Sequence, residues 1–223
     1  MAKKLRVALE IGPRGKKVAV WAPGWPGLER GASTSEEAIE RLVDYLPRYE
    51  KVAKLAELDA EFATISGVTV VEEYPGTGST DFWGISFAFS SVDTRKMTSE
   101  QFERELTLMQ GCWRYFDDVR ARVSPEMLKG PRGGGRDRDR IVRHTLGAQQ
   151  DFAKKLGMKT PQNYVIVDAK ELKAFRKDYC DAIRTHHSEG QMARSWPLRY
   201  LIRHTAYHTM DHAWEMEDKD LTV

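Results

Sequence analysis

The period of apolar positions along the chain differs between its first and last parts. Near the N-terminus, apolar and polar residues alternate over 5–11, which places the apolar side chains on one face of a strand. The turn sequence Gly-Pro-Arg-Gly at 12–15 follows, and then a second apolar run at 17–21. This order predicts a β-hairpin.

A helix is predicted after the hairpin, beginning at Glu36 and capped by Ser33 or Ser35. Its inward positions are Ile39, Leu42, Val43 and Leu46. Pro47 is expected to bend or end the first part of this helix, because proline lacks the backbone donor that a helix interior requires.

Two more strands are predicted at 68–73 and 83–89, separated by the turn sequence Pro-Gly-Thr-Gly at 75–78. The pattern leaves open whether they extend the N-terminal sheet or cover the later helices.

From residue 97 the apolar residues recur every three or four positions, in four segments. These segments run over 98–123, over 137–156, from Asp168 and from near Pro197. Gln101 after Thr98 and Glu171 after Asp168 have the spacing of helix-start signals, and Gly157 is a stop signal. Four such helices predict an antiparallel four-helix bundle.

The predicted fold class is therefore α+β, with a small N-terminal β-β-(β)-α domain followed by the bundle. The expected divisions are a domain over 1–60, connecting strands over 61–96, and the bundle over 97–223.

Composition narrows the classes of partner. The 223 residues include 35 Lys and Arg against 33 Asp and Glu, so no whole-protein field favours nucleic acid, which is not expected as a partner. No apolar run approaches the roughly 20 residues that span a bilayer, so no membrane association is expected. Two cysteines are too few for a disulfide framework, which favours a cytoplasmic location.

The last helix carries three of the six histidines on one face: His204, His208 and His212. Residues four apart lie one turn above another, so His208 and His212 can direct their rings at one divalent ion. His204 and His212 are about 12 Å apart along the helix axis, so all three cannot bind the same ion. A third ligand must come from another helix.

His144 is the predicted third ligand, because it interrupts the inward stripe Ile141-His144-Ala148-Phe152 of the second helix. Glu215, one turn beyond His212, is a candidate to orient the imidazoles through their other ring nitrogen. Asp211 and Tyr207 are further candidates to orient the imidazoles.

Residues 98–218 resemble the DinB-like superfamily of metal-binding four-helix bundles. The matching features are His144 on the second helix and the His208-x-x-x-His212 pair on the fourth. The resemblance implies a zinc, nickel, iron or manganese ion on three residues. Some members use Glu in place of one histidine, so the resemblance leaves open whether Glu215, or the additional His204, joins the metal site. It also implies a metal-dependent transferase or isomerase that uses a low-molecular-weight thiol with a small-molecule substrate.

The N-terminal segment resembles the HicB-like fold, in the run from Trp21 to Gly27, then Gly31, then 33–42. This resemblance implies a structural or interaction domain.

Three neutral imidazoles would leave an ion with its full charge and with open coordination positions, as in catalytic sites. The expected reaction is attack by a metal-held thiol, so no catalytic protein residue is assigned. Cys112 and Cys180 are predicted to be small buried side chains. The alternatives are a non-catalytic metal-binding stress or interaction module and a metal-dependent hydrolase. The choice between monomer and homodimer is left open.

The segment 129–140 combines five basic residues with four glycines immediately before the His144 helix. We interpret Arg132 and Arg136 as candidates to bind the carboxylates of a thiol cosubstrate beside the metal. A flexible, solvated connector is the alternative interpretation.

Overall fold

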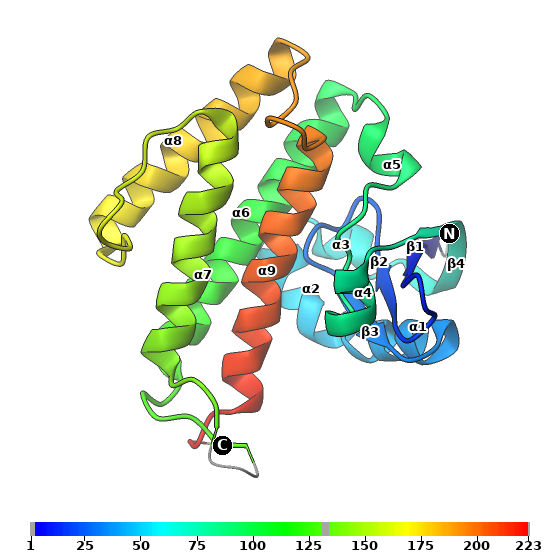
Figure 1. Ribbon diagram of the computed structural model, residues 1–223, viewed down its shortest axis with the longest axis horizontal. Coiled ribbons are helices and arrows are strands. Elements are labelled where there is room, and N and C mark those ends of the chain that lie inside the picture. Colours follow the sequence, from blue (N-terminus) through cyan, green and yellow to red (C-terminus); the bar gives the residue numbers. More distant parts are fainter. Residues whose placement is uncertain (1–2, 131–133, 223) are drawn as a thin grey trace. The chain divides into compact units, whose positions relative to one another are not determined.

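The structure is a computed structural model that describes residues 3–130 and 134–222 (Figure 1). The chain divides into two compact units, Met1–Cys112 and Trp113–Val223. The described chain is α+β, with a four-stranded sheet in the first unit followed by several helices, as the sequence predicts at this level. Arg132 lies outside the described residues.

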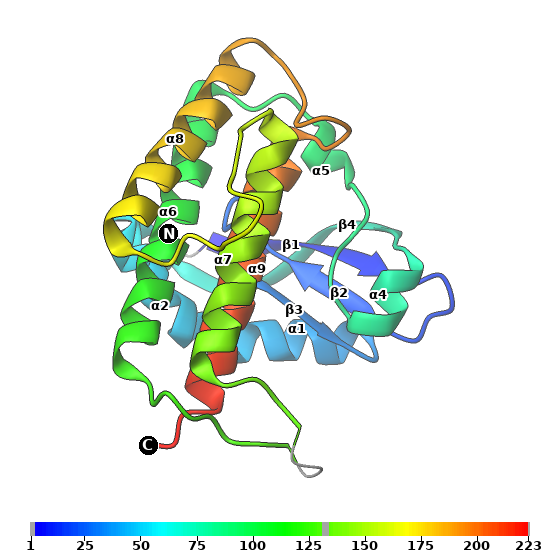
Figure 2. The same ribbon diagram turned by 60° about the vertical axis from the view of Figure 1, so that its left-hand side comes forward.

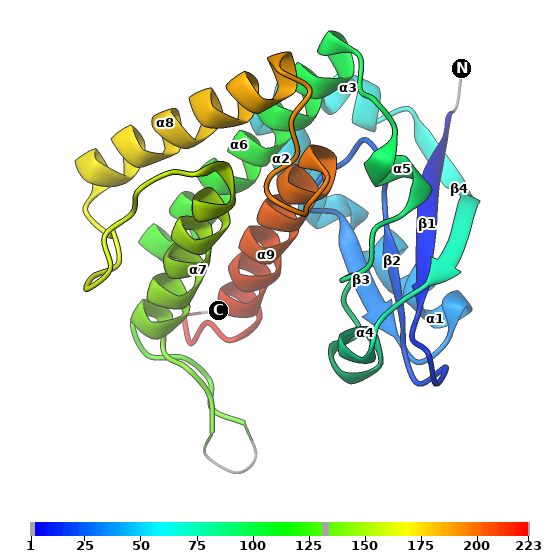
Figure 3. The ribbon, with the colours of Figure 1, turned by 45° about the horizontal axis from the view of Figure 1, so that its top comes forward.

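The sheet contains β1 (Lys3–Ile11), β2 (Val18–Trp21), β3 (Glu29–Ala32) and β4 (Ile65–Pro75) in the spatial order β3-β2-β1-β4 (Figure 3). β2 pairs antiparallel with both β1 and β3, whereas β4 runs parallel to β1. All four residues of β2 are buried, as expected for a short central strand. The predicted hairpin is confirmed, and so is the strand predicted at 68–73.

The described residues before 99 also form five short helices. They are α1 (Ser35–Asp44), α2 (Leu46–Leu55), α3 (Asp59–Phe62), α4 (Gly78–Trp83) and α5 (Ser91–Thr94). The cap of α1 is Thr34, whose hydroxyl accepts from the Glu37 amide at 3.2 Å, so both predicted caps were one residue away. Pro47 lies in the first turn of α2, where its missing N–H costs no helical hydrogen bond.

The prediction of a strand at 83–89 is wrong. Buried carboxylates, not a neighbouring strand, accept from the backbone amides of this segment. Glu29 accepts from Ser86 N at 2.7 Å, and Glu10 accepts from Phe87 N and Ala88 N at 3.0 Å each. The alternating pattern could not reveal this, because it does not show which groups satisfy the backbone donors.

Long helices dominate the rest of the chain: α6 (Ser99–Arg122), α7 (Arg138–Ala153, continued by a 3-10 turn at Lys154–Leu156), α8 (Ala169–Ser188) and α9 (Leu198–Asp218). α6 runs across the division between the two units. The predicted starts at Thr98, Asp168 and Pro197 are confirmed to within a residue. None of the described helices is both long and apolar enough to cross a membrane.

The inward stripe predicted for α7 needs correction. The buried face of this helix includes Ile141, Thr145 and Gln149, whereas His144 is exposed and Phe152 is half-buried. The predicted stripe is about one position away from the buried face. The prediction counted only apolar side chains, and this face also contains polar ones.

Figure 2 shows the backbones of the four long helices. A chain of buried and partly buried polar contacts links them. Arg176 of α8 donates to Asp117 of α6 at 2.6 Å and to the Gln149 carbonyl of α7 at 3.3 Å. The Gln149 amide donates in turn to the Thr209 hydroxyl of α9 at 3.2 Å. Buried polar groups are costly when they lose their partners, so this chain favours one alignment of the helices.

Substituting Gly31 should test the packing of α4 on the sheet. A Cβ at Gly31 would lie 1.9 Å from the carbonyl oxygen of Gly84, which is backbone and cannot rotate away. We expect Gly31→Ala to lower the free energy of unfolding by about 2 kcal/mol or more, as overpacking does. Denaturant unfolding should show little or no loss for the control Gly78→Ala, which meets nothing within 4 Å. Equal stability of the two variants would contradict this packing.

Candidate metal centre

Three histidines from two helices converge in the second unit. His208 and His212 occupy successive turns of α9, and His144 lies in the second turn of α7. Each ring offers one nitrogen, and these three atoms all lie within 4.8 Å of one another. The ring centroids are 4.6 Å apart for His208 and His212, 4.8 Å for His144 and His212, and 5.1 Å for His144 and His208.

Exposure differs across the three rings. His144 is exposed, His208 is half-buried, and His212 is 6% exposed. The group is therefore anchored in the protein on one side and accessible to solvent on the other. A small molecule could reach it, as a catalytic metal site requires.

Glu215 holds the most buried of the three rings. Its carboxylate accepts from His212 Nδ1 at 2.7 Å, from Lys219 Nζ at 2.7 Å and from Arg136 at 3.1 Å. Because Nδ1 of His212 is engaged by Glu215, Nε2 is the nitrogen left to face the other rings. Such a carboxylate contact is the usual way in which a metal-binding histidine is oriented.

His208 provides an observation that fits a cation at this position. Its Nδ1 is buried and has no hydrogen-bond partner among the described residues. Buried polar atoms are normally satisfied, so an unpartnered imidazole nitrogen within a three-histidine group suits a site that holds an ion. Three imidazoles are also a known donor set for zinc, nickel and iron.

The pKa values of His208 and His144 also favour metal binding. Burial lowers the pKa of His208 well below its usual 6.5, and the charges of the neighbouring histidines and Arg136 lower it further. The pKa of His144 is also lowered, by burial first and then by His212 and Arg136. Near neutral pH both rings are therefore the neutral form that a metal needs.

Glu215 remains a carboxylate throughout the physiological range. Burial would raise its pKa, but the hydrogen bonds from His212 and Lys219 and the charge of Arg136 outweigh burial and lower the pKa to about 2. The Glu215 carboxylate therefore stays negatively charged beside Nδ1 of His212.

Of the two arginines predicted to bind a cosubstrate, Arg136 lies beside the triad. It is half-buried, it pairs with Glu215, and its charge influences His144 and His208. Lys219 was not anticipated from the sequence. Its position four residues after Glu215, at the C-terminal cap of α9, is the signal that could have revealed the contact.

His204 lies outside the triad. Its ring stacks on Tyr200 at 5.1 Å and contacts the edges of Phe152 and Trp196. Tyr207 packs near His204, at 6.3 Å between ring centroids. Of the residues considered as supporting groups, Glu215 accepts a hydrogen bond from a triad ring, that of His212.

Neither cysteine is placed to act as a nucleophile. Cys112 and Cys180 are both buried free thiols, as predicted. Burial raises the pKa of the Cys112 thiol far above neutrality, which removes the reactive thiolate.

Comparison of the chain with protein families, with curated proteins and with solved structures finds no significant match.

Substitution of Glu215 should weaken metal binding without removing a ligand. We expect Glu215→Ala to lower the affinity for Zn²⁺ by about 10- to 100-fold, because His212 loses the acceptor that orients its ring. Glu215→Gln keeps an acceptor and should lose less. Competition with a chelator measures these affinities. Asp218→Ala, at an exposed position of the same helix, is the control, and an equal loss in both alanine variants would refute the role of Glu215.

The metal-free protein should lose stability in mild acid. Because the folded pKa of His208 lies below 6.5, the unfolded chain binds a proton at pH values where the folded chain does not. Stability should therefore fall as the pH decreases through 6.5 towards the folded value. Thermal unfolding at several pH values should show a smaller decrease in Tm for His208→Gln than for the wild type. Parallel decreases in both proteins would mean that His208 is not the group responsible.

Proposed function

We propose that this protein binds one divalent metal ion through His144, His208 and His212, and that it is a metal-dependent thiol transferase or isomerase of the DinB-like kind. The observation that carries this proposal is the convergence of three imidazole nitrogens from α7 and α9 within 4.8 Å of one another. Packing alone does not require three imidazoles at one point, and the buried Nδ1 of His208 is costly if nothing satisfies it.

The proposal includes the arrangement of α6 to α9 as an antiparallel four-helix bundle. Two features support it: the predicted helix starts and the buried polar contacts that run through Asp117, Arg176, Gln149 and Thr209. Metal sites in such bundles use side chains that project from facing helices, as His144 and the α9 pair do here.

A bound divalent ion would supply Lewis acidity that lowers the pKa of a coordinated thiol or water. The chain's own residues would supply ligands and orientation. Glu215 would fix the His212 ring, and the neutral rings of His144 and His208 would leave the charge of the ion uncompensated. With both cysteines buried, the nucleophile would come from a low-molecular-weight thiol.

Positive charge beside the triad favours a cosubstrate that carries a carboxylate. Arg136 and Lys219 both contact Glu215, so two cations share one carboxylate. The side chain of Arg136 is 35% exposed, and its donors that do not face Glu215 can bind an anionic group. The same role that the sequence suggested for Arg132 remains a prediction.

The N-terminal unit would serve as a HicB-like structural or interaction domain, and the protein would act in the cytoplasm. The order β1-β2-β3-α1 supports this only at the level of element order. The substrate would be a small electrophilic molecule.

Metal analysis of the purified full-length protein tests the proposal. We expect about one equivalent of divalent metal in the wild type. His208→Ala/His212→Ala should lose the metal because one remaining imidazole cannot hold it. The control is His186→Ala/His187→Ala, at the end of α8. Mass spectrometry for metals measures the content, and circular dichroism confirms folding.

The same proteins test the reaction. The metal-loaded wild type should consume a low-molecular-weight thiol in the presence of an electrophile from a panel, and the triad variant should not. Equal metal in the wild type and in the triad variant would refute the site. Metal-loaded protein that consumes no thiol with any electrophile would refute the transferase and leave a non-catalytic metal-binding module.

A further inference from the structure

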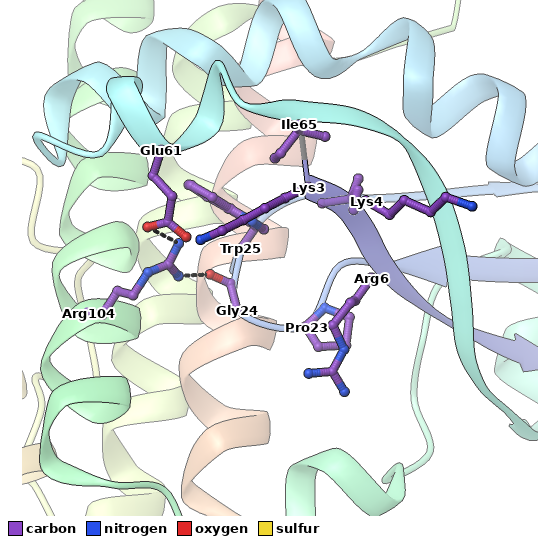
Figure 4. A pocket seen from close by; sticks show the side chains of 10 residues that line it. Lys3, Lys4, Arg6, Pro23, Gly24, Trp25, Glu61, Ile65 and Arg104 are labelled. Atoms are coloured by element: carbon purple, nitrogen blue, oxygen red, sulfur yellow. Dashed lines mark hydrogen bonds and ion pairs between the residues drawn. The ribbon is translucent and has the colours of Figure 1, made fainter. Parts of the chain in front are cut away.

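A cavity of about 200 Å³ lies in the first unit (Figure 4). It is lined by the start of β1, by the turn at 23–25, by the first residue of β4 and by two side chains from helices. The charged lining residues are Lys3, Lys4, Arg6, Glu61 and Arg104.

The floor of the cavity is rigid. Trp25 is 7% exposed and packs edge-on against Phe62 and Tyr49, at 5.0 and 6.2 Å between centroids. The guanidinium of Arg104 lies 4.3 Å from the centre of the Trp25 ring and donates to the carbonyl of Gly24. This preorganisation lowers the entropic cost of binding a ligand.

The charge of the lining is unbalanced. Arg104 pairs with Glu61 at 3.3 Å, so these two charges offset each other. Lys3, Lys4 and Arg6 have no ion-pair partner among the described residues. Lys3 extends across Trp25, and Arg6 lies beside Pro23, whereas Lys4 points away (Figure 4). Lys3 and Arg6 are therefore two exposed, unpaired cations at the border of the cavity.

We propose that this cavity binds a small organic oxyanion, a phosphate or carboxylate attached to a carbon skeleton about the size of a six-membered ring. Lys3 and Arg6 bind the anionic oxygens, and Pro23, Trp25 and Ile65 contact the skeleton. A cavity of about 150 Å³ accepts benzene, so 200 Å³ accommodates such a ring.

The positive charge at the border of the cavity and its apolar lining favour this ligand over the alternatives. A neutral apolar ligand would make no use of the two cations, and a bare inorganic ion would leave the apolar lining unused. This inference does not rest on the proposed metal site, because every lining residue belongs to the first unit.

Calorimetric titration of the full-length protein at low ionic strength tests the proposal. Three probes separate charge from ring: phenyl phosphate carries both, phenol carries only the ring, and inorganic phosphate carries only the charge. We expect phenyl phosphate to bind at least tenfold more tightly than either of the others. Lys3→Gln and Arg6→Gln should each weaken its binding about fivefold or more.

Two further proteins serve as controls. Lys54→Gln removes an exposed cation of α2 and should leave binding unchanged. The His208→Ala/His212→Ala variant should also bind phenyl phosphate as the wild type does, because the cavity lies in the other unit.

The outcomes are distinct. Loss of binding in the histidine variant would place the anion at the triad and overturn the proposal. Binding that is insensitive to both Lys3→Gln and Arg6→Gln would overturn it too, and equal affinity for inorganic phosphate would overturn the role of the skeleton.

Discussion

The hydrogen bond between Gln149 of α7 and Thr209 of α9 is the constraint on which the histidine site depends. Apolar helix faces can slide or rotate against each other at modest cost, but a buried amide that loses its partner costs about 1–3 kcal/mol. Arg176 engages the other end of the same amide and reaches Asp117, so the register of α7 is held from two sides. A shift of α7 by one residue would turn His144 by about 100° away from the α9 pair.

The charges around the triad favour a cation at the imidazole nitrogens and an anion at the neighbouring position. Burial keeps His144 and His208 neutral, which favours a cation at their nitrogens. One turn away, Glu215 is shared by Arg136 and Lys219, so this side carries a net positive charge. A cation at the rings would add to that charge. The position next to it therefore attracts an anion, and electrostatics alone would select a negatively charged cosubstrate for the proposed reaction.

The parts of the structure that follow local rules could be predicted from the sequence, and the others could not. Caps such as Thr98 and Asp168 act within one helical turn, so the starts of the long helices were predictable. The pair His208 and His212 is also a local feature. By contrast, the segment 83–89 is shaped by Glu10 and Glu29, which lie more than 50 residues away in the chain. The cavity near Trp25 depends on Arg104 in the same way.

The distribution of the three histidines over two helices has a consequence for stability. His208 and His212 already lie together on α9, whereas His144 joins them only when α7 is packed in place. An ion bound to all three would therefore bind the folded arrangement and not the unfolded chain. By mass action such an ion stabilises the fold by an amount that grows with its concentration over its dissociation constant. If the proposed ion binds all three rings, the exposed His144 is the one whose release would cost the least burial, so exchange of the ion would begin on the α7 side.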